Sequence, residues 1–403
     1  MCDMSCYGHI AHFIFGKWRG KVTSLSFLLS PKCFMAADQN SSSGFFSMGR
    51  RTWRSVSVPL TAVLLAALIG AIILSVSGAN PLEAYAALIE GSFGTTQTFG
   101  RTLEKATPLI LSGLAVAFAF KAGLFNIGAQ GQLLFGAITA AAVGFGIQGL
   151  PAIIHAPLAF LVGGLAGALY GAIPGALKTY TGAHEVITTI MLNFVAINLT
   201  DYLADGPWKD TSPGNIVART PAVLETAEIP TIGNIPLGFF LAVLAAIVTW
   251  WLLYRTTLGY EIRTVGFNPH AAHYAGIRVS ATVILAMALS GFLAGIGGSI
   301  ETLGVVGRFQ PGFNANLGFD GITIALLGKT HPLGVIPGAL LVGAMRAGSN
   351  RMQFNAGVSF EIIDVILALV LFFVAADMIV RWIIRVRAVE EEKITLSTGW
   401  GSQ

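Results

Sequence analysis

The sequence predicts an all-α protein, a polytopic bundle of about ten transmembrane helices with both termini in the cytoplasm. Hydrophobic residues make up 54% of the 403-residue chain and charged residues only 11%. A soluble domain carries about 25% charged residues, so lipid rather than water must cover most of this surface. The 48 glycines fit the close packing of helices in membranes.

Apolar runs that approach the roughly 20 residues needed to cross a bilayer define the expected helices. The windows are 57–78, 106–121, 130–147, 153–177, 185–204, 236–254, 279–303, 319–330, 333–349 and 359–380. The eighth and ninth windows are short and are interrupted by Lys329, His331 and Pro332. They therefore form either two spans or a helical hairpin that does not cross completely.

The placement of basic residues sets the orientation. With the N-terminus inside, residues such as Arg50, Arg255 and Arg381 fall on the cytoplasmic side, which holds more Lys and Arg than the other side. The positive-inside rule then favours both termini in the cytoplasm, as an even number of spans requires. We expect a multi-pass protein of the inner (plasma) membrane.

The chain divides into three expected regions. Residues 1–47 are a disordered extension or a misassigned start before Met48, the alternative being a genuine short cytoplasmic segment. Residues 48–388 form the transmembrane domain, and 389–403 form a cytoplasmic tail. The three cysteines all lie in the first region and match no zinc spacing, so we expect no metal site.

A row of glycines at every fourth position marks the fourth window: Gly163, Gly167, Gly171 and Gly175. Such a row forms a ridge against which a second helix lies closely. We expect a role in helix packing rather than contact with a ligand. The pairs Gly291/Gly295 and Gly334/Gly338 repeat the spacing.

Polar side chains inside apolar runs are candidates for a translocation pathway, because they are costly in lipid. Asn126, Gln130 and Gln132 lie with two glycines between the second and third windows, where they predict a re-entrant turn or, alternatively, a simple cytoplasmic turn. Glu185, Thr189 and Asn193 share one helical face, where they either line a route for a polar solute or bond to neighbouring helices.

Further polar candidates lie elsewhere in the chain. Phe194 and Asn198 follow the stripe on the fifth window. A second group, expected near the outer mouth, is free to form salt bridges with Arg308, Arg346 or Arg351. It comprises Glu301, Asn314, Asn316 and Asp320. The segment 205–235 is the longest external loop, either a docking surface or a connector.

No catalytic constellation is recognisable, so we expect no enzyme. Gly328-Lys329-Thr330 resembles the end of a phosphate-binding loop, but Thr323 stands where the motif needs glycine. No Lys/Arg-rich run indicates a nucleic-acid partner. Uphill transport would therefore draw its energy from an ion gradient or from a separate ATPase.

The cytoplasmic loop 255–278 carries the clearest local signal. Asn268 suits a helix N-cap, Pro269 suits the first helical position and Gly276 suits a stop. These residues predict a short helix, Pro269 to Ala275, whose small side chains fit a groove on another protein.

This loop resembles the coupling loop of bacterial ABC importer permeases. The resemblance lies in Leu258-Gly259, in 263–268 and in 271–277, and the family includes the branched-chain amino acid, ribose and simple-sugar permeases. Segments 125–132, 185–193 and 318–328 are similar to the nucleoside-type branch, although Gln130 stands where Glu is expected.

The resemblance implies a set of partners: a second homologous permease, a cytoplasmic ABC ATPase that holds ATP and Mg²⁺, and an external solute-binding lipoprotein. No cofactor is expected on this chain itself. The residues that would couple to the ATPase are Gly266, Asn268, Pro269, Ala271, Ala272, Tyr274 and Gly276.

The resemblance to the nucleoside-type branch implies a purine or pyrimidine nucleoside as the substrate, and a neutral solute with a flat base is compatible with amides, hydroxyls and aromatic rings. A simple sugar such as ribose or galactose is the alternative. An ion-coupled secondary carrier is a further alternative, with Glu185, Glu301 or Asp364 as the ion or proton site.

Overall fold

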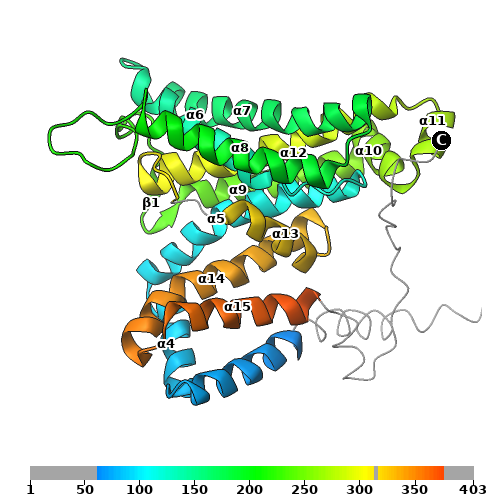
Figure 1. Cartoon of the computed structure of the whole chain (residues 1–403). Coiled ribbons are helices and arrows are strands. Elements are labelled where there is room, and N and C mark those ends of the chain that lie inside the picture. Colours follow the sequence, from blue (N-terminus) through cyan, green and yellow to red (C-terminus); the bar gives the residue numbers. More distant parts are fainter. Residues whose placement is uncertain (1–60, 313–315, 376–403) are drawn as a thin grey trace, which may run out of the picture. The chain divides into compact units, whose positions relative to one another are not determined.

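The computed structural model describes residues 61–312 and 316–375, which are mostly helical (Figure 1). The expectations for 1–47, the tail 389–403 and Asn314 lie outside these residues. The helices of the first half are Thr61–Val76, α4 (Pro81–Phe93), α5 (Thr96–Lys121), α6 (Ala129–Gly146), α7 (Ala152–Thr181) and α8 (Glu185–Asp205). Those of the second half are α9 (Leu237–Arg255), α10 (Thr257–Phe267), α11 (Pro269–Tyr274), α12 (Val279–Glu301), η2 (Thr302–Val306), α13 (Leu317–Leu327), α14 (Pro332–Ala356) and α15 (Phe360–Ala375).

Each predicted apolar window coincides with a helix, but their capacity to cross a bilayer differs. Among the described residues, six helices are long and apolar enough to span: α5, α6, α7, α8, α9 and α12 continued by η2. The helix Thr61–Val76 and α13 are shorter apolar helices. The structure thus confirms a helical bundle with six candidate spans, and it does not confirm the count of ten.

Three helices were not anticipated: α4, α10 and the π-helical η2. In addition, α5 begins at Thr96 rather than at residue 106, so that prediction was too short. Charged residues near the start of α5 make that part of the sequence less hydrophobic, so the apolar window began too late. Thr95 nevertheless caps the helix there, because its hydroxyl oxygen accepts a hydrogen bond from the amide of Thr98.

Helix α5 is the centre of the bundle. Its most apolar 18-residue window is 89% buried, because α4, α9, α12, α13 and α14 all pack against it. The corresponding windows of α8 and α9 are only 22% and 28% buried. These outer helices therefore offer their apolar side chains to surrounding lipid or to a partner.

The predicted glycine row lies at the tightest helix contact, between α7 and α12. A Cβ atom added to Gly167 would lie 2.7 Å from the Cα of Gly295, and one added to Gly171 would lie 2.6 Å from the carbonyl oxygen of Met287. Gly163 and Gly175 likewise meet neighbouring backbone. Only hydrogen fits at these positions, so the two backbones approach more closely than side chains would permit.

The bundle has two distinct ends. At the α11 end, Gly123 meets Gly266 and the ring of Tyr254 stacks on His331. At the other end, called the loop end, the short antiparallel hairpin of β1 (Thr231–Ile232) and β2 (Ile235–Pro236) pairs Thr231 with Pro236. Helix α9 connects the two ends across about 28 Å, close to the thickness of a bilayer core (Figure 1).

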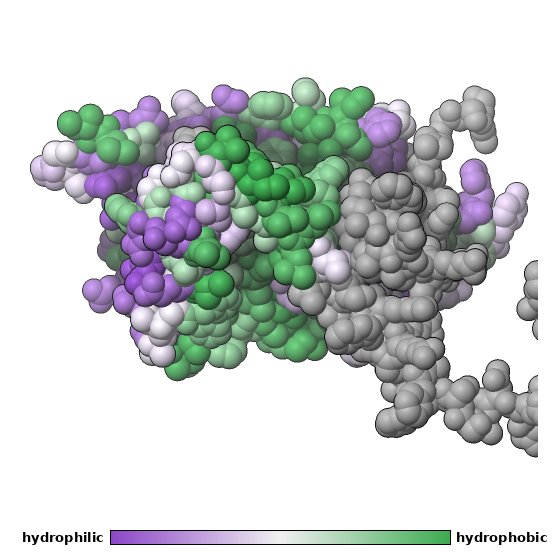
Figure 2. Space-filling model, turned by 90° about the horizontal axis from the view of Figure 1, so that it is seen from below, coloured by the Kyte–Doolittle hydropathy of each residue, from purple (hydrophilic) through white to green (hydrophobic). Residues whose placement is uncertain are grey.

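The surface agrees with a membrane location. On the face shown in Figure 2, hydrophobic residues form a broad band, and hydrophilic residues gather beyond one of its edges. Exposed apolar side chains include Leu165, Leu169 and Phe194. Extended apolar patches on a protein surface mark contact with lipid or with another protein.

The α7–α12 contact yields a stability prediction. Gly167→Ala should lower the melting temperature of the detergent-solubilised protein, because the added methyl group must displace backbone, at a cost of about 1–3 kcal/mol. Gly146→Ala is the matched control, since nothing lies within 4 Å of a Cβ added there. Equal melting temperatures for the two variants would contradict the proposed packing.

Candidate functional site

The chain between α5 and α6 turns back into the bundle. In this turn, residues 122–128, Asn126 Nδ2 donates to Ser290 Oγ at 2.8 Å, and Ser290 Oγ donates to the carbonyl oxygen of Ala115 at 2.6 Å. Ser290 lies about 16 Å into α12 from its start at Val279. The turn therefore reaches the middle of the bundle, and the re-entrant interpretation holds over that of a simple surface turn.

Amide side chains satisfy this buried backbone. Asn126 Nδ2 donates to Gln132 Oε1 at 2.8 Å, and Gln132 Nε2 donates in return to Asn126 Oδ1 at 3.2 Å. The same Asn126 oxygen accepts from the amide of Gly128 at 3.0 Å. Irregular backbone persists at membrane depth only where protein or water satisfies it, and here the amides do so.

Helix α8 is fastened to this turn by Asn193. Its Oδ1 accepts from the amide of Gly131 at 2.8 Å, and its Nδ2 donates to the carbonyl oxygen of Ile127 at 2.9 Å. The hydroxyl of Tyr170, on α7, also donates a hydrogen bond to α8, at the carbonyl oxygen of Leu192 (2.6 Å). One asparagine thus fixes both sides of the start of α6.

A second interrupted helix meets the first. The amide of Gly318, at the start of α13, donates to Gln130 Oε1 at 2.7 Å. Helix α13 has 11 residues, about 16 Å, which is half of a bilayer core. The N-termini of α6 and α13 therefore meet inside the bundle, where their amide groups carry partial positive charge.

One ion pair belongs to this interrupted helix. Asp320, in the first turn of α13, pairs with Arg346 of α14, as the sequence allowed. Arg351 instead pairs with Glu90 of α4, a helix that the sequence did not predict. Asp320 and Arg346 thus neutralise each other between two packed helices.

The short helix predicted in the loop 255–278 is confirmed within one residue, because α11 runs from Pro269 to Tyr274. Asn268 caps it by accepting from the amide of Ala271 at 3.0 Å, and Gly276 ends it at a φ of 83°. Only Ala272 is buried, whereas Tyr274 is 91% exposed. Nearly all of the surface of α11 is therefore accessible.

The α11 end touches the re-entrant turn directly. A Cβ atom added to Gly266 would lie 2.9 Å from the carbonyl carbon of Ala122 and 2.9 Å from the amide nitrogen of Gly123. Gly123 has a φ of 71°, which favours glycine. A displacement of α10 and α11 therefore meets the backbone that leads to Asn126.

The long segment 205–235, which the sequence predicts to be external, is hydrogen-bonded to the loop end of the bundle. The amide of Thr220 donates to the carbonyl oxygen of Phe309 at 2.9 Å, and the amide of Leu224 donates to that of Gly144 at 3.0 Å. His155 of α7 contacts Thr226 Oγ1 at 2.8 Å. Hydrogen bonds from Ser212, together with Arg219, lower the pKa of Asp210 in this loop. The segment is thus held against the loop end of the bundle by hydrogen bonds and does not extend freely from it.

The structure separates the predicted pathway residues into two groups. The first group is buried and is bonded within the protein: Asn126, Gln130, Gln132, Thr189 and Asn193. The second group remains accessible, with Phe194 59% exposed and Asn198 on the same open side of α8. Glu185 pairs with Lys178 at 2.6 Å. The roles of all these residues in a translocation pathway stay predictions.

Sequence reasoning missed two members of the buried group. Ser290 joins the turn to both α5 and α12, and Tyr170 joins α7 to α8. The available signal was the single tyrosine in the apolar window 153–177 for Tyr170, whereas Ser290 is one of several hydroxyl residues in its window and was not distinguished from them. Within the described part of the chain, no group of three His, Cys, Asp or Glu residues could hold a metal ion.

The fold and this site define a membrane permease, and the chain belongs to the family of permease components of branched-chain amino acid transport systems. The model of that family matches residues 98–376. The expectation of an importer-permease family, made from the loop and the turn, is confirmed. No solved structure matches the chain.

Three relatives that are similar over most of this chain are all permeases of ABC transporters. A guanosine ABC transporter permease of Bacillus subtilis (strain 168) is 41% identical over 330 residues, 81% of this chain and 94% of that protein. A nucleoside ABC transporter permease of Lactococcus lactis subsp. cremoris (strain MG1363) is 34% identical over 86% of this chain and 98% of its own. A glucose ABC transporter permease of Haloferax volcanii (strain ATCC 29605) is 35% identical over 80% of this chain and 89% of its own length.

The attachment of α8 to the turn can be tested by mutation. Asn193→Ala should destabilise the protein by about 1–3 kcal/mol for each buried group left unpaired, here the amide of Gly131 and the carbonyl of Ile127. Asn198→Ala is the control, because that exposed amide bonds only within its own helix. Thermal unfolding in detergent should separate the two, and equal losses would refute the structural role of Asn193.

Proposed function

We propose that this chain is a permease subunit of an ABC importer that carries nucleosides. The observation that carries the proposal is the near full-length similarity to a guanosine and a nucleoside ABC transporter permease. The exposed, capped helix α11 supports it, because such a helix fits a groove on a separate ATPase. The assembly would lie in the inner (plasma) membrane.

The proposed complex has three further components: a second homologous permease, a cytoplasmic ABC ATPase and an external solute-binding lipoprotein. The ATPase would hold ATP and Mg²⁺, and this chain would hold neither. We place α11 in the cytoplasm and the loop end outside, with both termini in the cytoplasm and ten spans. In that topology α13 contributes a half-span.

The proposed mechanism is a rigid-body change of access. Closure of the ATPase on ATP would push α11, and the contact of Gly266 with Gly123 would pass the push to the re-entrant turn. The amides there link the turn to α8, α12 and α13. ATP shifts the equilibrium only because the ATPase binds it more tightly in one state.

The accessible side chains of α8 are the proposed contacts for substrate. Phe194 offers an aromatic face to a base, and Asn198 offers an amide to a polar edge. The buried amides, in contrast, are already satisfied, so their role is to hold the helices in place. A neutral nucleoside needs no fixed charge at such a surface.

A simple sugar remains the second candidate, and the glucose permease relative is the observation that favours it. It shares 35% identity with this chain, close to the 34% of the nucleoside permease. A sugar would use the same amides but would leave the aromatic surface of α8 largely unused.

Uptake of labelled guanosine tests substrate and energy source together. In cells that express the complete importer, unlabelled guanosine or adenosine should compete with the label, and excess ribose or glucose should not. Uptake should persist in an uncoupler while ATP is maintained and should stop when the ATPase is inactivated. If only the sugars compete with the label, the substrate is a sugar and not a nucleoside. If uptake collapses with the uncoupler, an ion-coupled carrier is favoured over an ATP-driven importer.

A further inference from the structure

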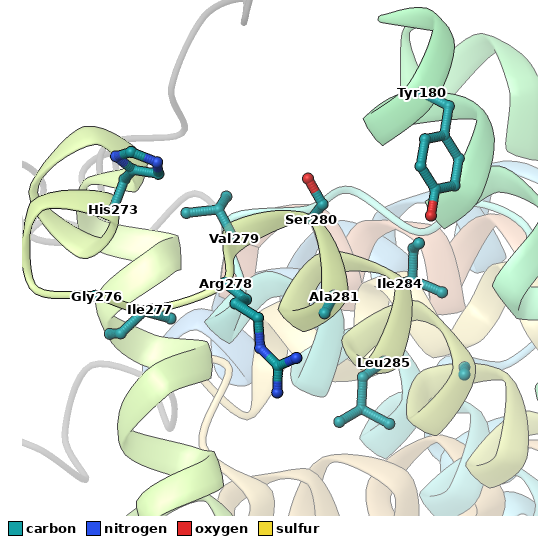
Figure 3. Close-up of a pocket in the computed structure, with 11 residues that line it drawn as sticks. Tyr180, His273, Gly276, Ile277, Arg278, Val279, Ser280, Ala281, Ile284 and Leu285 are labelled. Atoms are coloured by element: carbon teal, nitrogen blue, oxygen red, sulfur yellow. The ribbon is translucent and has the colours of Figure 1, made fainter.

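A pocket of about 770 Å³ lies at the α11 end, outside the turn and its amides (Figure 3). Tyr180 of α7 forms one wall, the turn Gly276–Val279 forms another, and the first three turns of α12 form the floor. In Figure 3, Tyr180 points toward Ile284, and Arg278 extends along α12 toward Leu285. The pocket is open on one side, so a long ligand can enter from the surroundings.

Polarity in the pocket changes with depth. The pocket has four polar lining residues. His273 lies on α11, and Arg278, Ser280 and Tyr180 lie at the ends of α12 and α7, where a membrane helix meets the headgroups. Ile284 and Ala288 follow at about 9 Å and 15 Å along α12 from Arg278. This order, polar at the helix end and aliphatic further in, is the order of a phospholipid from headgroup to acyl chain.

The charge of the pocket is complementary to a phosphate. None of the lining residues is acidic, and Arg278 forms no ion pair with any carboxylate of the described chain. A guanidinium group binds phosphate oxygens in a bidentate manner. In Figure 3 the Arg278 guanidinium lies on the Leu285 side of α12, whereas Ser280 and Tyr180 lie on the other side. Basic pockets between membrane helices are known binding sites for anionic headgroups.

We propose that this pocket binds one anionic phospholipid, with its phosphate at Arg278 and an acyl chain along Leu285 and Ala288. The small side chains of Ala281 and Ala288 leave space for a chain beside the helix. The inference depends on the membrane location and not on the transported substrate. The lipid would lie beside α11, so it would stabilise the loop that we propose to meet the ATPase.

Native mass spectrometry of the purified full-length permease tests the site. After titration with phosphatidylglycerol, the wild-type protein should retain one lipid that Arg278→Gln binds about tenfold more weakly, the loss expected for one charge-assisted phosphate contact. Arg278→Lys should retain part of the affinity. Arg255→Gln is the matched control, because this arginine lies at the same end, outside the pocket, over the ring of Trp250.

Two results would overturn the proposal. Equal retention of phosphatidylcholine and phosphatidylglycerol, or equal retention by the wild-type protein and Arg278→Gln, would remove the anionic headgroup from the site. A photocrosslinking residue in place of Leu285, which is 40% exposed, should yield a phospholipid adduct in native membranes. A polypeptide adduct would instead assign the pocket to a second permease or to the ATPase.

Discussion

The internal satisfaction of the re-entrant turn 122–128 is the constraint on which the rest of the structure depends. A helix interrupted within a membrane leaves backbone amides and carbonyls without partners, and lipid offers none. Asn126 and Asn193 supply these partners from the turn itself and from α8, and Gln132 holds the Asn126 side chain in place. Once these bonds form, the positions of α6, α8 and α12 around the turn are fixed, and α13 joins them through Gln130.

The glycine contacts explain how such a core can be both rigid and movable. Close backbone packing of α7 on α12, with side chains such as Phe292 and Met287 beside the glycines, leaves little room for one helix to shift against the other, so we expect the pair to move as one body. The contact of Gly266 with the Lys121–Gly123 backbone is equally close. A push on α11 therefore meets stiff backbone rather than flexible side chains, which favours a switch between discrete arrangements.

The sequence predicted those features that depend on local chemistry. The apolar windows, the cap at Asn268 and the stop at Gly276 each follow from residue types a few positions apart, and the structure contains them. Features that depend on distant contacts were missed. Helix α4 is held by its contact with α14, including the pair of Glu90 and Arg351, and the burial of amides depends on Ser290, 164 residues from Asn126. The same limit applied to the pathway residues, since residue type made both Asn193 and Asn198 candidates but did not separate the buried side chain from the exposed one.

Two variants in the complete importer show whether motion of α11 reaches the turn through Gly266. We expect Tyr274→Ala to weaken association with the ATPase, because Tyr274 is 91% exposed on α11. We expect Gly266→Ala to keep the ATPase bound at a normal membrane level but to lose ATP-driven nucleoside uptake, because the added methyl group must displace the backbone of the turn. Uptake by Gly266→Ala at the wild-type rate, with the ATPase bound, would show that the motion does not pass through this contact.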